Sequence, residues 1–365
     1  MKRCITTLII FGIFIMNSTV YAQEDHKYKI NGYYGIKSYA QFQKLRENND
    51  LSIFDSMTFA WSKMSYDDEL DEIYIDMKDK KSGFYLPEGY EEPLYYFKNM
   101  NITTQLNIYA DKDYDEIFDQ KEKIINQIIS ALEDKKFDGV VIDFELLPID
   151  HKEIFIDFLK GLKVELDKNE KTLVVATSPL DSYDFKEIGQ VSDSIILMLH
   201  DYDSKVLEKV DHEFVVVNPL TPIESINKDI VKIKQQMDGD LSKFLFQINF
   251  AIGQWQVKDG VLINKKAYTP AYESLKKRIE IENKKLNMFS FYDENFKNPY
   301  LYYLDHGTYN TIWYEDSRSI KAKIDILKEN GFEGLSIWRL GNIPDGEQFY
   351  LNVWEEIKSE LKVSR

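Results

Sequence analysis

The sequence contains little cysteine and fewer basic than acidic residues. Its 365 residues include one Cys, at position 4, which excludes an internal disulfide framework. Asp and Glu number 62 against 46 Lys and Arg, and the formal net charge is -16. This acidic balance argues against nucleic-acid binding, because phosphate backbones are neutralised by Lys and Arg. It also disfavours docking on anionic lipid, so we expect an uncharged or amide-bearing substrate.

The chain also lacks internal repeats, low-complexity tracts and linkers rich in Pro, Gly or Ser. Hydrophobic residues make up 44% of the sequence and aromatic residues 14%, which argues against a disordered chain. The length is compatible with two ordinary domains, but α/β barrels of more than about 250 residues fold as one domain. We expect a single barrel, with two independent domains as the weaker alternative.

Residues 1–22 have the three-part layout of a secretory signal peptide. Lys2 and Arg3 precede an apolar run from Ile5 to Met16, and small residues follow up to Ala22. The run is shorter than the about 20 residues that span a bilayer, so a membrane anchor is the weaker interpretation. We expect cleavage after Ala22. The mature chain would then be residues 23–365, without cysteine and without membrane attachment, located outside the cell or in the cell envelope.

Short apolar runs rich in β-formers alternate with longer helical stretches, which is typical of a parallel α/β fold. Val140–Ile142 and Ile195–Met198 are continuously apolar, as expected for strands buried on both faces. Eight runs qualify as strands, the number in a closed (β/α)8 TIM barrel. They are Ile30–Ile36, Ser56–Trp61, Thr103–Tyr109, Gly139–Glu145, Leu173–Thr177, Ser194–Met198, Phe244–Asn249 and Gly334–Trp338.

Helical periodicity predicts helices between these strands, over Glu122–Leu132, Ile154–Leu166 and Ser317–Asn330. Two stretches, residues 63–101 and 254–314, are too long for simple loops. The second has its own helical pattern, over Tyr272–Leu286, and is rich in Tyr and Phe. We therefore expect a small α+β insertion at about residues 254–314, after the seventh strand.

The fourth predicted strand ends in two carboxylates. Residues two apart share a face of a strand, so Val141, Asp143 and Glu145 point the same way, with Glu145 at the carboxyl end. In a barrel that end carries the active site. Two carboxylates this close repel each other, so one holds its proton near neutral pH and is suited to general acid catalysis. The alternative is an apolar strand that simply ends in acids leading into a turn.

The segment Asp138–Glu145, DGVVIDFE, resembles the DGxDxDxE signature on the fourth barrel strand of glycoside hydrolase family 18, the chitinase family. Leu197–Asp201 lies where this family has Met-x-Tyr-Asp, and Ser336–Trp338 matches the segment that ends in a sugar-stacking Trp. Trp313–Ser319 is similar to the WFEDARS segment of the spore-cortex-lytic and germination-type N-acetylglucosaminidase branch. Trp255 also fits the pattern of that branch, and the resemblance covers essentially the whole mature chain.

The resemblance implies a retaining glycoside hydrolase with no metal or cofactor. Glu145 would be the general acid/base, and Asp143 would orient the 2-acetamido group of the substrate. In this family the acetamide oxygen attacks the anomeric carbon, an exception to the two-carboxylate scheme. The implied partner is a glycan containing β-linked N-acetylglucosamine, such as peptidoglycan, chitin oligosaccharides or the N-glycan core. We expect the chain to act as a monomer.

Further residues are expected to bind the glycan. The strand-end aromatics Tyr34 and Trp61 would line the cleft, although packing is the more common role of such rings. Asn107 and Gln247 would lie inside the barrel, with hydrogen bonding behind the site as the alternative. The expected substrate-binding residues are Asp138, His200, Asp201, Tyr202, Trp338, Tyr34, Trp61, Asn107, Gln247 and Trp255.

Two positions depart from the family pattern. Val141 replaces the middle Asp of the signature and cannot form hydrogen bonds, so we expect slower turnover or a shifted pH optimum. His200 replaces a Tyr that contacts the acetamide; a second register would align Tyr202 and Asp203 with the Tyr-Asp pair but would misplace Met198. These departures keep open a different class of function, a barrel that binds glycans without cleaving them. The retained Asp143 and Glu145 argue against it.

Overall fold

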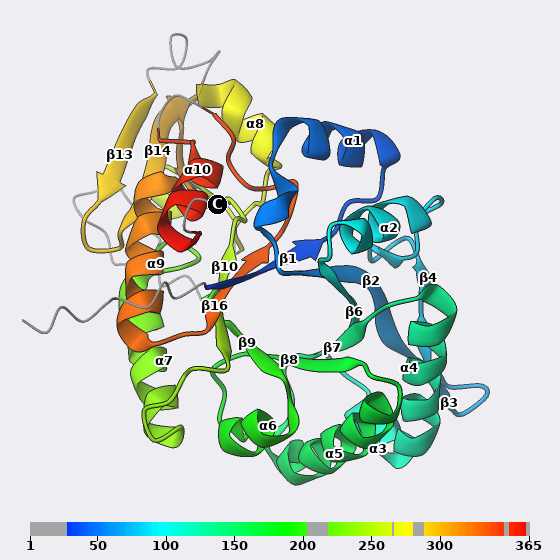
Figure 1. Cartoon of the computed structure of the whole chain (residues 1–365). Helices are drawn as coiled ribbons and strands as arrows, with labels where there is room; N and C mark the ends of the chain where they lie inside the picture. Colours follow the sequence, from blue (N-terminus) through cyan, green and yellow to red (C-terminus); the bar gives the residue numbers. More distant parts are fainter. Residues whose placement is uncertain (1–27, 203–217, 265, 280–287, 347–349, 363–365) are drawn as a thin grey trace, which may run out of the picture.

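The computed structural model describes residues 28–202, 218–264, 266–279, 288–346 and 350–362 (Figure 1). Its centre is a closed barrel of eight parallel strands, in which the first strand pairs with both the second and the last. The predicted barrel is therefore confirmed. The barrel strands are β1 (Lys29–Tyr34), β2 (Ser56–Asp67), β6 (Thr103–Ala110), β7 (Gly139–Phe144), β8 (Thr172–Thr177), β9 (Ser194–Met198), β10 (Phe244–Asn249) and β16 (Gly334–Trp338). The predicted signal peptide lies outside the described residues.

Helices surround the barrel and cover its outer face (Figure 1). Their buried apolar side chains pack against the outward side chains of the strands in one large cluster. The three helices predicted from periodicity correspond to α4, α5 and α9. The covering helices are α1 (Tyr39–Asn48), α2 (Glu91–Asn99), α3 (Tyr114–Asp119), α4 (Lys121–Lys135), α5 (Lys152–Lys168), α6 (Phe185–Val191), α7 (Ile223–Gln236), α9 (Ser317–Asn330) and α10 (Val353–Leu361), with 3-10 turns η1 (Leu51–Ile53) and η2 (Ile149–His151). None of the helices in the described ranges is long and apolar enough to cross a membrane.

Inside the barrel, the side chains change from apolar to polar. A small apolar cluster contains Val141, Val174, Ala176, Ile196 and Leu245, with Tyr33 and Ala60 completing it. Buried amide and hydroxyl groups, including Asn31, Asn107 and Gln247, project from the same strands. Because active sites of such barrels lie at the carboxyl ends of the strands, these polar groups form the floor of the candidate site.

The first long stretch, residues 63–101, is not a loop. β2 continues to Asp67, beyond its predicted end, and pairs with the antiparallel β3 (Glu72–Asp76). The short strands β4 (Lys78–Asp79) and β5 (Phe84–Tyr85) pair with each other before α2 begins. The prediction ended β2 too early because its outer half is only partly buried and no longer reads as a continuous apolar run.

The second long stretch is the predicted α+β insertion. It forms a five-stranded antiparallel sheet in the order β12-β11-β15-β14-β13 and includes the short helix α8. The predicted helix over 272–286 is described only to residue 279, and its α-helical part ends earlier, at Lys277. The bounds are β11 (Gly253–Lys258), β12 (Val261–Leu262), α8 (Tyr272–Lys277), β13 (Phe289–Asp293), β14 (Asn298–Asp305) and β15 (Thr308–Trp313).

A buried ion pair connects the end of the insertion with the helix that follows it. Lys323 of α9 donates hydrogen bonds of 2.8 and 3.0 Å to the carboxylate of Glu315. The same carboxylate accepts a 3.0 Å hydrogen bond from Asn298 of β14. Asp316 forms the N-cap of α9 in a capping box with Ser319. The insertion is thereby held at the rim of the barrel, beside α9.

Candidate active site

Asp143 and Glu145 lie at the carboxyl end of β7. Asp143 is buried, with 4% of its surface exposed, and its Oδ2 accepts a 3.0 Å hydrogen bond from Asn107 Nδ2 of β6. Its Oδ1 has no hydrogen-bond partner among the described residues. Glu145 follows the strand and is half-buried. Its backbone N–H donates to Ala110 at 2.7 Å and its carbonyl oxygen accepts a hydrogen bond from the Tyr114 hydroxyl, which fixes the backbone at this position.

The surroundings favour protonation of both carboxyls. Burial raises the pKa of Asp143 to about 6, against the opposing effects of the Asn107 hydrogen bond and of His200. Burial also raises the pKa of Glu145 to about 7, and the nearby charge of Asp143 adds to this increase. A carboxyl group that stays protonated near neutral pH and reaches solvent can donate a proton to a leaving oxygen.

His200 lies at the carboxyl end of β9 and connects two neighbouring polar groups. Its Nδ1 lies 2.8 Å from Asp201 Oδ2, and its Nε2 lies 2.6 Å from Gln247 Oε1. Burial lowers the pKa of His200, but the hydrogen bond and charge of Asp201 outweigh this effect, and the net direction is upward. Asn249 donates a 3.0 Å hydrogen bond to the other oxygen of Asp201, and Gln247 donates one of 3.2 Å to Ser336. His200, Asp201 and Gln247, all predicted site residues, thus form one hydrogen-bonded chain.

Tyr33 contacts Trp338 and also interacts electrostatically with the two carboxylates. The Tyr33 ring meets the Trp338 ring edge-to-face, with 5.0 Å between the ring centroids. Burial and then the charges of Asp143 and Glu145 raise the pKa of Tyr33 well above its usual range, while a hydrogen bond with Gln247 opposes the rise. Trp338 is half-buried at the end of β16 and packs against the interior apolar cluster that contains Tyr33.

The structure does not bring Tyr34 and Trp61 to the site. Their exposed fractions are 2% and 0%, and both belong to the cluster between the barrel and its helices. Tyr34 packs on Phe42 of α1 and Phe97 of α2, and Trp61 packs on Tyr34 with 5.7 Å between ring centroids. The prediction that these two rings line the cleft is therefore wrong, because they face outward on strands that are buried on both faces.

Tyr202 is also directed away from the carboxylates. Its hydroxyl donates a 2.8 Å hydrogen bond to Asp229 of α7, and its ring packs against the outer cluster. Asp203, the other residue of the alternative register, lies outside the described residues. Met198, by contrast, is buried on β9 beside Gln247 of β10, and His200 reaches the site. This placement favours the register that aligns His200 and Asp201 with the Tyr-Asp pair of the family.

Asp138 and Trp255 lie elsewhere in the molecule. Asp138 precedes β7 at its amino end, opposite to Glu145, and accepts hydrogen bonds of 2.9 and 2.7 Å from the N–H and hydroxyl of Thr104 and another from Lys98. Trp255 is buried in the insertion, where it forms a cluster with Trp313. Their predicted contact with substrate is not supported, because Asp138 lies at the opposite end of β7 from Glu145 and Trp255 is buried inside the insertion.

Tyr33, Tyr109 and Asn249 were not among the predicted site residues. Tyr109 is the last residue but one of β6 and pairs with Asp143 of β7, and burial followed by the charge of Glu145 raises its pKa. For Tyr33 a signal is present in the sequence: it is two residues from Asn31, and an Asn within an apolar strand indicates the polar interior face. No group of three or more His, Cys, Asp or Glu in the described part of the chain is arranged to hold a metal ion.

Comparison with known proteins places this geometry among glycosidases. The profile of the family described as "Glycosyl hydrolases family 18" matches residues 6–342. The "Cortical fragment-lytic enzyme" of Bacillus anthracis is 25% identical over 233 residues, which cover 60% of this chain and 50% of that protein. An uncharacterized glycosylase of Bacillus subtilis is 24% identical over 310 residues, or 78% of this chain and 82% of that protein. The chain spans about half the length of the cortical fragment-lytic relatives.

Solved structures share the fold at low sequence identity. The spore cortex-lytic enzyme SleL of Bacillus cereus superposes with a TM-score of 0.70 and 18% identity, over 92% of this chain and 75% of that one. A chitinase from Chromobacterium violaceum superposes with a TM-score of 0.67 and 16% identity, over 92% of this chain and all of that one.

Proposed function

The chain belongs to glycosyl hydrolases family 18, and from this premise we propose that it is a retaining glycosidase that cleaves glycans at β-linked N-acetylglucosamine with Glu145 as general acid/base. One observation carries the proposal: Glu145 is half-buried at the carboxyl end of β7, with its pKa raised to about 7 beside the buried Asp143. With this pKa a large fraction of Glu145 is protonated at neutral pH, and a protonated carboxyl is what cleavage of a glycosidic bond requires of the general acid.

The proposed reaction has two steps. In the first, Glu145 donates its proton to the glycosidic oxygen, the bond to the leaving sugar breaks, and the acetamide oxygen of the substrate attacks the anomeric carbon. Asp143 orients the acetamido group and stabilises the charge that develops on it. In the second, Glu145 takes a proton from water, and the resulting attack opens the cyclic intermediate with retention of configuration.

The surrounding polar groups have positioning roles in this proposal. Asn107 holds one oxygen of Asp143 through its 3.0 Å hydrogen bond, and Tyr33 stays protonated as a donor beside both carboxylates. His200, held between Asp201 and Gln247, presents a ring where the family has a Tyr hydroxyl. Trp338 would stack on the apolar face of a pyranose ring.

Bacterial wall glycan is the substrate class we favour, with chitin oligosaccharides as the second choice. The names of the Bacillus relatives refer to lysis of spore cortex, and a structural neighbour is a chitinase. We also propose export of the protein, supported by the apolar and basic pattern of residues 1–22.

The test compares the wild-type protein with Glu145→Gln on N-acetylglucosamine oligomers and on purified peptidoglycan. New reducing ends are followed by mass spectrometry, and we expect cleavage by the wild type and a loss of about 10²- to 10⁴-fold in the variant. Glu88→Gln removes the same charge at an exposed turn and serves as the matched control. Binding without cleavage, equal in wild type and Glu145→Gln, would establish the glycan-binding alternative and overturn the proposal.

A further inference from the structure

Two cationic side chains, Lys37 and Arg339, lie at the carboxyl end of the barrel, after β1 and β16. In the described residues neither forms an ion pair, although the chain carries a large excess of acids. Lys37 is half-buried, and its Nζ donates hydrogen bonds of 3.0 and 3.5 Å to the backbone oxygens of Ala60 and Tyr85. Its hydrogen bonds therefore go to neutral groups, and no counter-charge to it is found in the part of the chain that the structure describes.

Arg339 directly follows Trp338, the residue expected to stack on the sugar. Its guanidinium carbon lies 5.7 Å from the centroid of the Trp338 ring. Its side chain passes close over Gly35, where an added Cβ would lie 2.9 Å from Arg339 Cδ and 3.3 Å from Nη1. Glycine at position 35 thus leaves room for the guanidinium beside the end of β1.

The two cations act on each other. Burial, followed by the positive charge of Arg339, lowers the pKa of Lys37 to about 8. Arg339 itself is exposed, so water solvates its charge. The half-buried Lys37 is thus the charge that is less well solvated, and an anion bound near both side chains would offset it.

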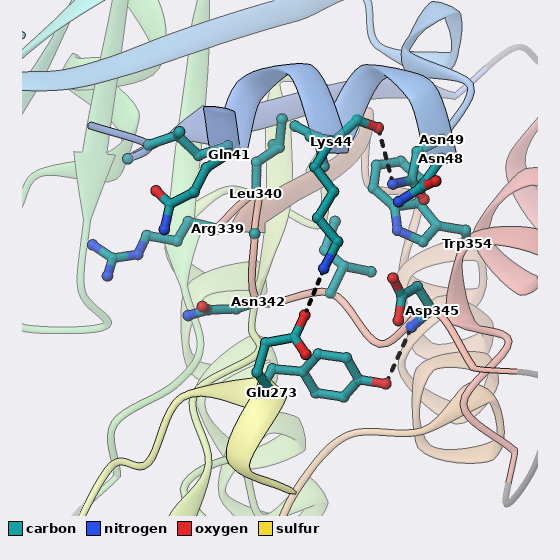
Figure 2. A pocket seen from close by; sticks show the side chains of 16 residues that line it. Gln41, Lys44, Asn48, Asn49, Glu273, Arg339, Leu340, Asn342, Asp345 and Trp354 are labelled. Carbon is teal, nitrogen blue, oxygen red and sulfur yellow. Dashed lines mark hydrogen bonds and ion pairs between the residues drawn. The ribbon is translucent and has the colours of Figure 1, made fainter. Parts of the chain in front are cut away.

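Arg339 also borders a pocket with a volume of about 360 Å³. The pocket lies between α1, α8 and the segment after β16, and Figure 2 shows Arg339, Gln41 and Asn342 together on one side of it. A neighbouring cation in the same pocket, Lys44, is paired with Glu273 of α8 at 3.1 Å. The contrast shows that carboxylates are available nearby but are not directed at Arg339.

We propose that Lys37 and Arg339 form a subsite that binds a carboxylate carried by the glycan, next to the sugar that stacks on Trp338. The inference rests on the proposed function and refines it: the substrate is then an acidic wall glycan and not a neutral chitin chain. The planar guanidinium is suited to bind a carboxylate through two parallel hydrogen bonds, and Lys37 would add a point charge. The carboxylate has two possible sources, the lactyl ether of a muramic acid residue or the peptide attached to it.

The test measures kcat/KM for a peptide-free glycan of alternating N-acetylglucosamine and N-acetylmuramic acid, and for a neutral N-acetylglucosamine oligomer of equal length. For the double variant Lys37→Met, Arg339→Gln, we expect the ratio of the first to the second to fall by about 10- to 100-fold, the range that charge-assisted hydrogen bonds supply. Arg339→Lys should restore part of the ratio. Lys44→Met is the matched control and should leave the ratio unchanged.

A third substrate identifies the source of the carboxylate. In the peptide-bearing glycan the lactyl group is amide-linked, so only the peptide carries free carboxylates. Loss confined to the peptide-free glycan assigns the subsite to the lactyl group, and loss confined to the peptide-bearing glycan assigns it to the peptide; either result supports the subsite. An unchanged ratio on both acidic glycans overturns it, while wild-type cleavage would leave the proposed function standing.

The two proposals can also fail separately. If the wild type cleaves none of these glycans, the proposed function fails, and the subsite is then tested by calorimetry with the same oligomers. Tighter binding of the acidic oligomer than of the neutral one, lost in the double variant, would still support the subsite. Equal binding of the two oligomers would overturn it.

Discussion

Asn107 and Asp143 are joined across β6 and β7 by a 3.0 Å hydrogen bond from Asn107 Nδ2 to Asp143 Oδ2. Within the described residues no group donates to the other oxygen of this buried carboxylate. Val141, two residues earlier on the same face, is fully buried among apolar side chains and has no donor to offer. The carboxylate therefore accepts one hydrogen bond from the described residues. Burial raises its pKa, and the Asn107 hydrogen bond and the charge of His200 oppose this rise.

Val141→Asn should supply a second donor to Asp143. A hydrogen bond to the charged form stabilises it, so we expect the pKa of Asp143 to fall and the acidic limb of the kcat profile to move to lower pH. The amide enters an apolar cluster, so the free energy of unfolding should decrease by about 1–3 kcal/mol. Kinetics between pH 4 and 9 and thermal unfolding measure both effects. Val141→Ala, which adds no donor, should destabilise the protein without moving the limb; an unmoved limb in Val141→Asn would contradict the argument.

The pH dependence of activity should reflect the proton held by Glu145. Its pKa of about 7 means that the protonated fraction falls as the pH rises above 7, so kcat/KM should decrease about tenfold per pH unit on the alkaline side. Asp143→Asn removes the neighbouring negative charge, so the pKa of Glu145 should fall while burial keeps it above the ordinary value. A ¹³C carboxyl titration of Glu145 measures this shift even if turnover is too slow. An unshifted titration would show that the two carboxylates do not interact.

The barrel could be predicted from sequence because its strands are short, continuous apolar runs, separated by helical periodicity and ended by polar residues. Because the runs are continuously apolar, however, the sequence does not indicate which residues of a strand face the barrel interior and which face the helices. In β1, Tyr33 faces the interior and Tyr34 the helices, and both are buried aromatic residues. When both faces of a strand are apolar, the alternation of apolar and polar residues that distinguishes the two faces is absent. The prediction consequently chose Tyr34 for the cleft and overlooked Tyr33.

The remaining errors concern contacts between residues that are far apart in the chain. Trp255 is buried because β11 pairs with β15, more than fifty residues later, and no local pattern indicates that pairing. The common face of Asp143 and Glu145, by contrast, could be predicted from their spacing alone. Local spacing therefore predicted which side chains share a face of a strand, but not which face is directed to the barrel interior.

Asp138 should contribute to stability and not to turnover. It accepts hydrogen bonds from Thr104 and Lys98 at the amino end of β7, away from Glu145. Asp138→Asn should reduce the free energy of unfolding by about 1–3 kcal/mol at pH 7, with kcat unchanged. Burial raises the pKa of Asp138, but the hydrogen bonds from Lys98 and Thr104 outweigh this effect, and the pKa in the folded protein is lowered. The contribution of Asp138 to the free energy of unfolding is therefore fully present at pH values above its ordinary pKa. It is lost as the pH falls through the lowered pKa of the folded protein. Chemical unfolding at pH 7 and at pH 3 measures this; equal destabilisation at both would contradict the assignment.

Trp338 ends β16 and Trp61 lies within β2, and their substitution by Ala should have opposite consequences. Trp338 is half-buried beside Tyr33, so Trp338→Ala should raise KM about tenfold, equivalent to about 1.4 kcal/mol of glycan binding, with a small loss of stability. Trp61 is fully buried against Tyr34 and Phe59, so Trp61→Ala should cost about 3–5 kcal/mol of stability and leave KM unchanged for the folded fraction. Steady-state kinetics and denaturant unfolding of the two variants make the comparison. A raised KM in fully folded Trp61→Ala would show that Trp61 contacts the glycan. An unchanged KM in Trp338→Ala would show that Trp338 does not.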